Sequence, residues 1–181
     1  MKANRVRIIG GAWRSRQIAF PSREDLRPTP DRVRETLFNW LGQDLTGKSC
    51  LDLFAGSGAL GFEAASRGAR RVVMVENDAA VYRALVASRE ALAAAAVEPR
   101  KADALEFLQS DAGAYDVVFL DPPFKAGYWP RLAPLLPPRL AFGALVYYEG
   151  AAPPDLPREW ESVRQGRAGQ VSYQLLRRIE P

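Results

Sequence analysis

The chain has 181 residues, with 25 Lys and Arg, 21 Asp and Glu, one cysteine and no histidine. This length suits one catalytic domain with its own core, and a lone cysteine cannot form an internal disulfide. The missing histidines exclude the usual general base and, with so little cysteine, the common zinc sites, so we expect no metal. The net charge of +4 favours an anionic partner. The longest apolar stretch, residues 91–97, is too short to span a bilayer, which predicts a cytoplasmic protein without membrane contact.

The first 28 residues carry much of the positive charge. Two short strand-like runs flank Gly10 and Gly11, a pair that suits a tight hairpin turn. Alternation along the second run would place Arg14 and Arg16 on one face. We therefore divide the chain into a basic β-hairpin extension, residues 1–28, and a main domain, residues 29–181.

A helix is predicted over residues 30–41. Thr29 suits the N-cap, Pro30 takes the first helical position, and an acid follows in the first turn. Apolar residues recur at spacings of three and four, which predicts one buried stripe with charged residues, Arg34 among them, on its flanks. The stripe consists of Val33, Leu37, Trp40 and Leu41.

From residue 49 onward, short apolar runs alternate with helical segments, which is typical of βαβ units and a parallel sheet. The last two runs can pair as an antiparallel hairpin across residues 167–169. The pattern predicts an α/β fold with a seven-stranded, mostly parallel sheet that ends in this hairpin. The predicted strands are 49–54, 71–76, 99–102, 115–120, 144–148, 159–166 and 171–179, and the helices between them are 59–67, 79–95 and 105–109.

Residues 51–61 have the pattern of a buried strand, a glycine-rich turn and the start of a helix. Gly56 and Gly58 would let a ligand approach the backbone, and Glu76 ends the next strand where a carboxylate can accept both ribose hydroxyls of an adenosine. Dinucleotide enzymes share this fingerprint, so a nicotinamide-dependent oxidoreductase is one alternative. Asp52 favours S-adenosylmethionine instead, because a carboxylate repels a pyrophosphate but can bind the ammonium of the methionine tail.

The segment Asp121-Pro122-Pro123-Phe124 follows a buried strand and suits chemistry on a planar amino group. The lone pair of such an amine is delocalised into the ring, so acceptors aimed at both N–H bonds favour the more tetrahedral transition state. The Asp121 carboxylate and the Pro122 carbonyl could supply two acceptors, and Phe124 offers a flat face for an extruded base. Asp121 alone does not select the base, so an adenine or cytosine amino-methyltransferase acting on DNA or RNA is a second alternative.

Six segments spread over nearly the whole chain, 7–11, 26–29, 31–41, 51–61, 75–77 and 120–124, are similar to the RsmD family of bacterial 16S ribosomal RNA guanine-N2-methyltransferases. The resemblance implies a Rossmann-like class I methyltransferase sandwich and S-adenosylmethionine as the cofactor. It also implies a division of the cofactor site by ligand part. Asp52 and the turn with Phe54, Gly56, Ser57 and Gly58 would hold the methionine, Glu76 with Asn77 the ribose, and Asp103 with Ala104 would border the adenine.

The same resemblance implies methylation of a guanine of 16S rRNA within the small ribosomal subunit or its assembly intermediate. Separately from the resemblance, we expect the protein to be a monomer. Arginines of the N-terminal segment would contact phosphates, which position an enzyme on RNA without specifying a base. A catalytically silent RNA-binding module with this fold is a third alternative. The predicted RNA-contacting residues are Arg5, Arg7, Trp13, Arg14, Arg16 and Arg27.

Overall fold

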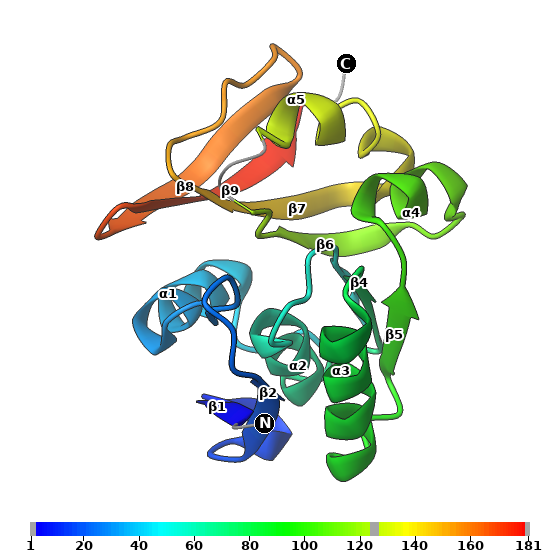
Figure 1. The fold of residues 1–181 in the computed structure, drawn as a ribbon. Coiled ribbons are helices and arrows are strands. Elements are labelled where there is room, and N and C mark those ends of the chain that lie inside the picture. The colour runs from blue at the N-terminus through cyan, green and yellow to red at the C-terminus, as the bar shows by residue number, and fades with distance from the viewer. Residues whose placement is uncertain (1–2, 124–126, 180–181) are drawn as a thin grey trace.

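A computed structural model of the chain describes residues 3–123 and 127–179. Helices pack on both faces of one large sheet, and a small hairpin lies at the N-terminal end (Figure 1). The elements in chain order are β1 (Ala3–Arg7), η1 (Gly11–Trp13), β2 (Gln17–Pro21), α1 (Asp31–Leu41), β3 (Ser49–Asp52), α2 (Ala59–Ser66), β4 (Arg71–Glu76), α3 (Ala79–Ala91), β5 (Val97–Lys101), α4 (Ala104–Ser110), β6 (Tyr115–Leu120), α5 (Trp129–Leu132), η3 (Pro137–Arg139), β7 (Leu140–Gly150), β8 (Trp160–Ala168) and β9 (Val171–Arg178).

The large sheet has seven strands in the order β5-β4-β3-β6-β7-β9-β8. The strands from β5 to β7 pair in parallel, and β9 is antiparallel to both β7 and β8. This arrangement confirms the predicted mostly parallel sheet with its C-terminal antiparallel hairpin and its N-terminal hairpin and helix. The chain leaves β3 toward β4 on one side and returns to β6 on the other, and ligands bind outside the carboxyl ends of strands at such a switch point.

Alternating side chains of the central strands pack into two hydrophobic cores, one on each face of the sheet. Cys50 and Val117 face the core shared by α1, α2, α3 and the N-terminal hairpin, while Leu51 and Val118 face α4 and α5. Cys50 is fully buried, and burial raises the pKa of its thiol to about 12, so it is an unreactive core residue as predicted. None of the described helices is both long and apolar enough to cross a bilayer.

The N-terminal hairpin differs from the prediction at its turn. Residues 8–16, which include η1, connect β1 to β2, so Gly10 and Gly11 do not form a tight turn between strands. Gly11 has a φ of 76° and lies against α2, where an added Cβ would stand 2.0 Å from the carbonyl oxygen of Ser66. Arg14 and Arg16 consequently lie in the connection and not on one face of a strand. The glycines serve tertiary packing, which local sequence does not reveal.

The start of α1 also differs from the prediction. The helix begins at Asp31 with Pro30 at the N-cap, and no side chain caps it. The Thr29 hydroxyl instead donates a hydrogen bond to Glu149, 120 residues later in the chain. Arg34, expected on the exposed flank of the stripe, is 1% exposed, and Phe38 is fully buried beside Val33 and Leu37.

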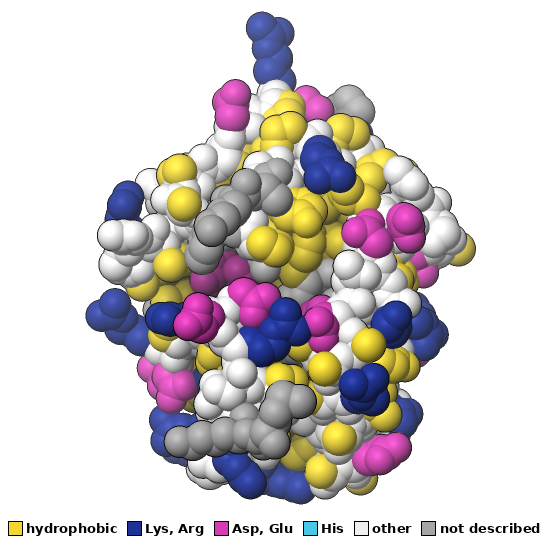
Figure 2. Space-filling view, in the orientation of Figure 1, with side chains coloured by type: hydrophobic (Ala, Val, Ile, Leu, Met, Phe, Trp, Pro, Cys, Tyr) yellow, Lys and Arg dark blue, Asp and Glu magenta, His cyan; other side chains and the backbone are white. Residues whose placement is uncertain are grey.

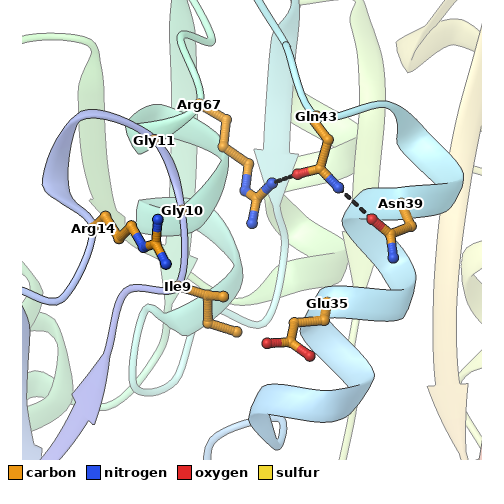
Figure 3. Close-up of a pocket in the computed structure, with 8 residues that line it drawn as sticks. All are labelled: Ile9, Gly10, Gly11, Arg14, Glu35, Asn39, Gln43 and Arg67. Carbon is orange, nitrogen blue, oxygen red and sulfur yellow. Dashed lines mark hydrogen bonds between the residues drawn. The ribbon is translucent and has the colours of Figure 1, made fainter.

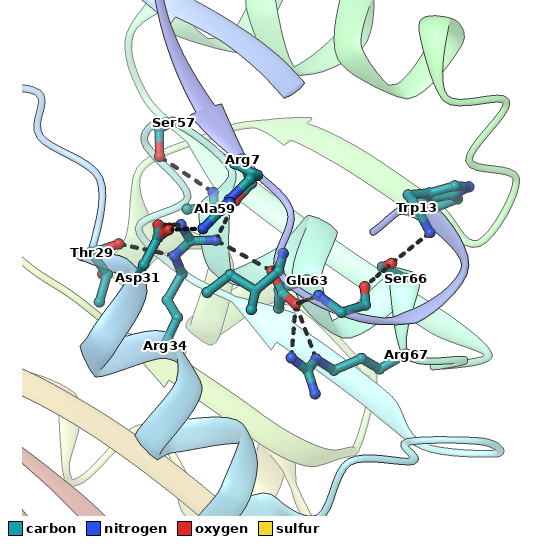
Figure 4. A network of polar contacts seen from close by, with 12 residues as sticks. Arg7, Trp13, Thr29, Asp31, Arg34, Ser57, Ala59, Glu63, Ser66 and Arg67 are labelled. Atoms are coloured by element: carbon teal, nitrogen blue, oxygen red, sulfur yellow. Dashed lines mark hydrogen bonds and ion pairs between the residues drawn. The ribbon is translucent and has the colours of Figure 1, made fainter. Parts of the chain in front are cut away.

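A buried ion network explains the position of Arg34 (Figure 4). The Glu63 carboxylate of α2 accepts hydrogen bonds from Arg34 and Arg67 at 3.2 and 3.0 Å, and from the backbone N–H groups of Ile9 and Gly10 at 2.9 and 2.8 Å. Burial lowers the pKa of the Arg34 guanidinium, whereas Glu63 and Asp31 raise it. Glu63 therefore joins the hairpin connection to α1 and α2.

Two short helices between β6 and β7, α5 and η3, were not predicted, and the other differences concern element ends. The helix predicted to residue 95 ends at Ala91, before Ala93 takes a φ of 50°. β5 begins two residues earlier than expected, and β7 extends from Leu140 to Gly150. The turn between β8 and β9 is centred on Gly169 and Gln170, with Gly169 at a φ of 58°.

Candidate cofactor and acceptor site

Four carboxylates lie on, or directly after, four adjacent strands at the carboxyl edge of the sheet. Asp52 of β3 is paired with Met74 of β4 on one side and with Phe119 of β6 on the other. Side chains two residues apart on a strand share a face. Glu76 is two residues beyond Met74 and Asp121 is two residues beyond Phe119, so both lie on the same face as Asp52 and nearer the carboxyl edge of the sheet. Leu120 is opposite Tyr148 in the parallel pair of β6 and β7, so the next residues, Asp121 and Glu149, are neighbours. We call Glu76, Asp52, Asp121 and Glu149 the carboxylate row.

The glycine turn after β3 is fixed to this row. The Gly56 N–H donates to Glu76 Oε2 at 3.0 Å, and the Gly61 N–H donates to Asp52 Oδ2 at 3.0 Å. Gly58 precedes α2 with a φ of 86°, and a Cβ there would come within 2.7 Å of the Phe62 ring. The turn therefore requires glycine, and the two predicted cofactor carboxylates orient it.

Asp52 is buried beside other acids. Its side chain is 1% exposed, and burial raises its pKa to about 7, with Glu76 adding to the rise and the Gly61 N–H opposing it. Glu76 accepts the N–H groups of Gly56 and Asp78 with its two oxygens. A positively charged ligand would relieve the repulsion in this row, so the residues suit the ammonium and sulfonium charges of S-adenosylmethionine.

The other predicted cofactor residues lie in the loops after β3, β4 and β5. Phe54 packs edge-on against Tyr128 with ring centroids 5.1 Å apart, and Ser57 is buried with its Oγ near the Ala59 N–H. Asn77 is exposed directly after β4. Asp103 caps α4 by accepting the N–H groups of Leu105 and Glu106, and Ala104 is 7% exposed beside it. The structure thus gathers all nine residues at the carboxyl ends of three adjacent strands.

Asp121 lies directly after β6 at the switch point between the cofactor loops and β7. Its side chain is half-buried, and burial raises its pKa well above the usual range, with further repulsion from Glu149 and Asp52. Pro122 is buried and Pro123 exposed. Phe124, the predicted stacking residue, lies outside the described residues.

Glu149 is the residue of the row that the sequence analysis missed. It is 5% exposed, and its Oε2 accepts the Tyr147 hydroxyl at 2.8 Å and the Thr29 hydroxyl at 3.2 Å. Burial raises its pKa, while the two hydroxyls oppose that rise. The available signal was an acid directly after an apolar strand, the same context that singled out Glu76 and Asp121.

The predicted RNA-contacting arginines are exposed, but two of them already have partners. Arg7 pairs with Asp31 at 2.8 Å, and Arg16 donates to the Ala91 carbonyl at 2.9 Å. Trp13 is half-buried against the core, and its backbone N–H donates to Ser66. No ion pair among the described residues involves the other three predicted arginines. These three are Arg5, Arg14 and Arg27.

The surface view places these charges relative to the site. Acidic and basic side chains alternate across the middle of the face shown, between the sheet and helices α1 and α2, and further basic side chains lie at the lower end, where the hairpin lies (Figure 2). A groove of about 710 Å³ runs there between the hairpin and α3. Alanines of α3 line it together with Arg5, Arg16, Arg23 and Arg83.

A smaller pocket of about 360 Å³ lies between the hairpin connection and α1 (Figure 3). Arg67 binds the Gln43 side chain there, and Gln43 in turn donates to Asn39. No member of the carboxylate row lines this pocket, and its most buried charge, Arg67, is already paired with Glu63. We therefore do not assign it to the cofactor.

Comparison with known proteins places the chain in a family. Residues 6–177 match the family model described as Conserved hypothetical protein 95. Ribosomal RNA small subunit methyltransferase D of Escherichia coli strain K12 is 42% identical over an alignment that covers 97% of this chain and 91% of that protein. The chain belongs to the RsmD family. The Haemophilus influenzae protein of the same name is 41% identical, with 94% of this chain and 92% of that protein covered.

Solved structures agree with this membership in the RsmD family. An Escherichia coli structure superposes with a TM-score of 0.88 at 42% identity and covers 98% of this chain and 100% of that one. An RNA methyltransferase from Salinibacter ruber, crystallised with S-adenosyl-L-homocysteine, has a TM-score of 0.66 at 26% identity and covers 84% and 94%. The predicted family and class I methyltransferase fold are confirmed, and a methyltransferase is favoured over the nicotinamide-dependent alternative.

Proposed function

We propose that this RsmD family member transfers a methyl group from S-adenosylmethionine to the exocyclic N2 amine of a guanine in 16S rRNA. The observation that carries the proposal is the half-buried Asp121 beside Pro122, next to the glycine turn at the switch point of the sheet. This position puts acceptors for an amine beside a site suited to a cationic cofactor. The names of the close relatives, which act on ribosomal RNA of the small subunit, support the substrate class.

The cofactor would be held by the segments that follow β3, β4 and β5, the first of which contains the glycine turn. Asp52 and the Phe54 to Gly58 turn would surround the methionine part, Glu76 with Asn77 the ribose, and Asp103 with Ala104 the adenine. S-adenosylmethionine, when bound, supplies an electrophilic methyl group. The buried carboxylates fit this ligand because its positive charge lowers the cost of ionising them.

The acceptor half of the site holds the amine and takes its proton. The Asp121 carboxylate and the Pro122 carbonyl accept the two N–H groups and so favour the tetrahedral nitrogen of the transition state. After methylation the nitrogen carries a positive charge and must lose one proton. The raised pKa of Asp121 makes its carboxylate a better proton acceptor than an exposed aspartate. Phe124 remains the predicted stacking face.

The RNA would lie over the basic end of the molecule. Arg5, Arg14 and Arg27 are exposed, whereas Arg7 and Arg16 already bind Asp31 and the Ala91 carbonyl. Trp13 would support the hairpin connection from its position against the core. The partner would be the small ribosomal subunit or its assembly intermediate. The protein would bind it as a monomer in the cytoplasm.

Labelled methyl transfer tests this function. The protein is given unmethylated small subunits, free 16S RNA and DNA, and the product nucleosides are separated. N2-methylguanosine from the ribosomal substrates is expected, and N6-methyladenine in DNA as the sole product would overturn the proposal. Asp121→Ala should lose at least about a hundredfold in rate, since a positioned acceptor contributes on that order. Asp155→Ala, an exposed acid, should match the wild type.

A further inference from the structure

Glu149 places a second carboxylate beside the acceptor Asp121. The two follow paired residues of adjacent parallel strands, whose backbones lie about 4.8 Å apart. Glu149 Oε2 already accepts the hydroxyls of Tyr147 and Thr29. Within residues 3–123 and 127–179, no hydrogen bond reaches Glu149 Oε1 or either oxygen of Asp121. Among the described residues, Glu149 Oε1 and the Asp121 carboxylate therefore remain available as acceptors at neighbouring positions.

The bases differ in what stands beside their exocyclic amine. In adenine the amine neighbours N1, and in cytosine it neighbours N3, and both ring nitrogens are acceptors. In guanine the N2 amine neighbours the N1–H, which is a donor. Two adjacent carboxylates therefore match the N2 amine and N1–H donors of guanine. They repel the lone pair of adenine N1 or cytosine N3. Enzymes that extrude a base read it by hydrogen bonds to this Watson–Crick edge.

We propose that Glu149 selects guanine by accepting its N1–H while Asp121 accepts the N2 amine. This inference rests on the proposed function and supplies what Asp121 alone lacks, a reason for guanine over adenine and cytosine. The Tyr147 and Thr29 hydroxyls hold Glu149 Oε2 and so turn Oε1 toward the base. Glu149 is thus a residue that contacts the substrate base as well as one that fixes the segment before α1.

A purely structural Glu149 makes a different prediction. A clamp for Thr29 and Tyr147 needs only an acceptor oxygen, which the amide of glutamine also provides. Glu149→Gln would then leave base preference unchanged, whatever its effect on stability. A base-reading Glu149 predicts that the preference itself changes, because the amide nitrogen is a donor where the carboxylate was an acceptor.

Nucleotide titrations followed by NMR, with the protein saturated with S-adenosylhomocysteine, separate these roles. The probes are guanosine monophosphate, inosine monophosphate, which lacks the amine, and 2,6-diaminopurine riboside monophosphate, which keeps the 2-amino group but has no N1–H. The wild type should bind the guanine nucleotide at least about tenfold more tightly than the diaminopurine nucleotide, since mismatched buried polar groups carry costs of this order. Glu149→Gln should remove or reverse that ratio, and Glu161→Gln, an exposed acid on β8, should keep it.

Each outcome decides the inference. A wild type without preference between the guanine and diaminopurine nucleotides overturns it, and this comparison needs no variant to fold. A Glu149→Gln protein with the wild-type ratio also overturns it. If the methyl-transfer assay yields N2-methylguanosine while either result holds, only the role of Glu149 fails. If that assay yields methylated adenine or cytosine, the proposed function itself fails.

Discussion

Asp52 is a carboxyl group in a position where its negative charge is unfavourable. It is 1% exposed, and this burial, together with the nearby Glu76, raises its pKa from 3.8 to about 7, while a hydrogen bond from the Gly61 N–H opposes the rise. Between these values the folded protein binds a proton that the unfolded chain has released. Because the folded state binds more protons, the free energy of unfolding falls as pH rises through this window.

Asp52→Asn should therefore stabilise the ligand-free protein at pH 8 and flatten its pH dependence. The amide keeps an acceptor for the Gly61 N–H but carries no charge, so the variant avoids a cost of at most about 4 kcal/mol. Urea unfolding at pH 5, 6, 7 and 8 measures this. Asp155→Asn, at an exposed position, should follow the wild-type curve. An Asp52→Asn protein with the full wild-type slope would contradict the account.

Gly58 fixes the conformation of the glycine turn between β3 and α2. Its φ of 86° disfavours any side chain, and a Cβ would meet the Phe62 ring at 2.7 Å and Leu85 at 2.8 Å. Both contacts lie in the core under the turn. A substitution there should displace the loop that Gly56 and Glu76 hold together.

Gly58→Ala should lose measurable binding of S-adenosylhomocysteine and about 2–4 kcal/mol of stability, since the left-handed backbone and the overlap both cost energy. Gly47→Ala is a matched control, because Gly47 has a φ of 80° but nothing within 4 Å of an added Cβ. It should lose only about 1–2 kcal/mol and keep ligand binding. Calorimetric titration and urea unfolding measure both effects. Equal ligand affinity in the two variants would refute a role for the packed turn.

A buried ion network joins α1 and α2. Glu63 is fully buried and is the shared acceptor of Arg34 and Arg67. Glu63→Gln should cost about 3–5 kcal/mol in urea unfolding, because the buried Arg67 loses its counter-charge and the buried Arg34 keeps only Asp31. Glu161→Gln breaks an exposed pair with Arg177 and should cost less than about 1 kcal/mol. A small effect at Glu63 would mean that water reaches the network.

What local sequence could predict follows from the range of the interactions. Apolar periodicity predicts the strands and the longer helices, and residue types at strand ends predict the glycine turn with Asp52, Glu76 and Asp121. The misplaced features depend on distant partners: Gly11 packs on Ser66, Arg34 binds Glu63, and Thr29 binds Glu149. Single-sequence patterns do not show such pairs, so the helix cap and the hairpin turn could be placed only from the fold. Glu149 has the same strand-end context in the sequence as Glu76 and Asp121, but its contact with Thr29 does not follow from that context.

At the scale of the whole molecule, one loop links the basic end to the carboxylate row. Residues 22–30 run from the hairpin to α1, and Leu26 lies 3.1 Å from the position of a Cβ on Gly56. The same loop contains Thr29, whose hydroxyl donates a hydrogen bond to Glu149. RNA bound along the hairpin would thus be continuous with the acceptor site, with Arg27 between them.

The affinity for RNA should depend on where positive charge is removed: loss of arginines at the hairpin end should weaken binding more than loss of the same charge elsewhere. A triple variant with Arg5→Gln, Arg14→Gln and Arg27→Gln should weaken binding to small subunits and reduce the slope of log affinity against log salt concentration by about 2–3, at roughly 0.7–0.9 per lost phosphate contact. The control triple removes the same charge near and on β8, with Arg158→Gln, Arg164→Gln and Arg167→Gln, all at exposed positions. Binding measured from low to moderate salt should leave the control slope near the wild-type value, because a charge that touches no phosphate releases no counterion. Equal slopes for the two triples would show that the hairpin end does not hold the RNA.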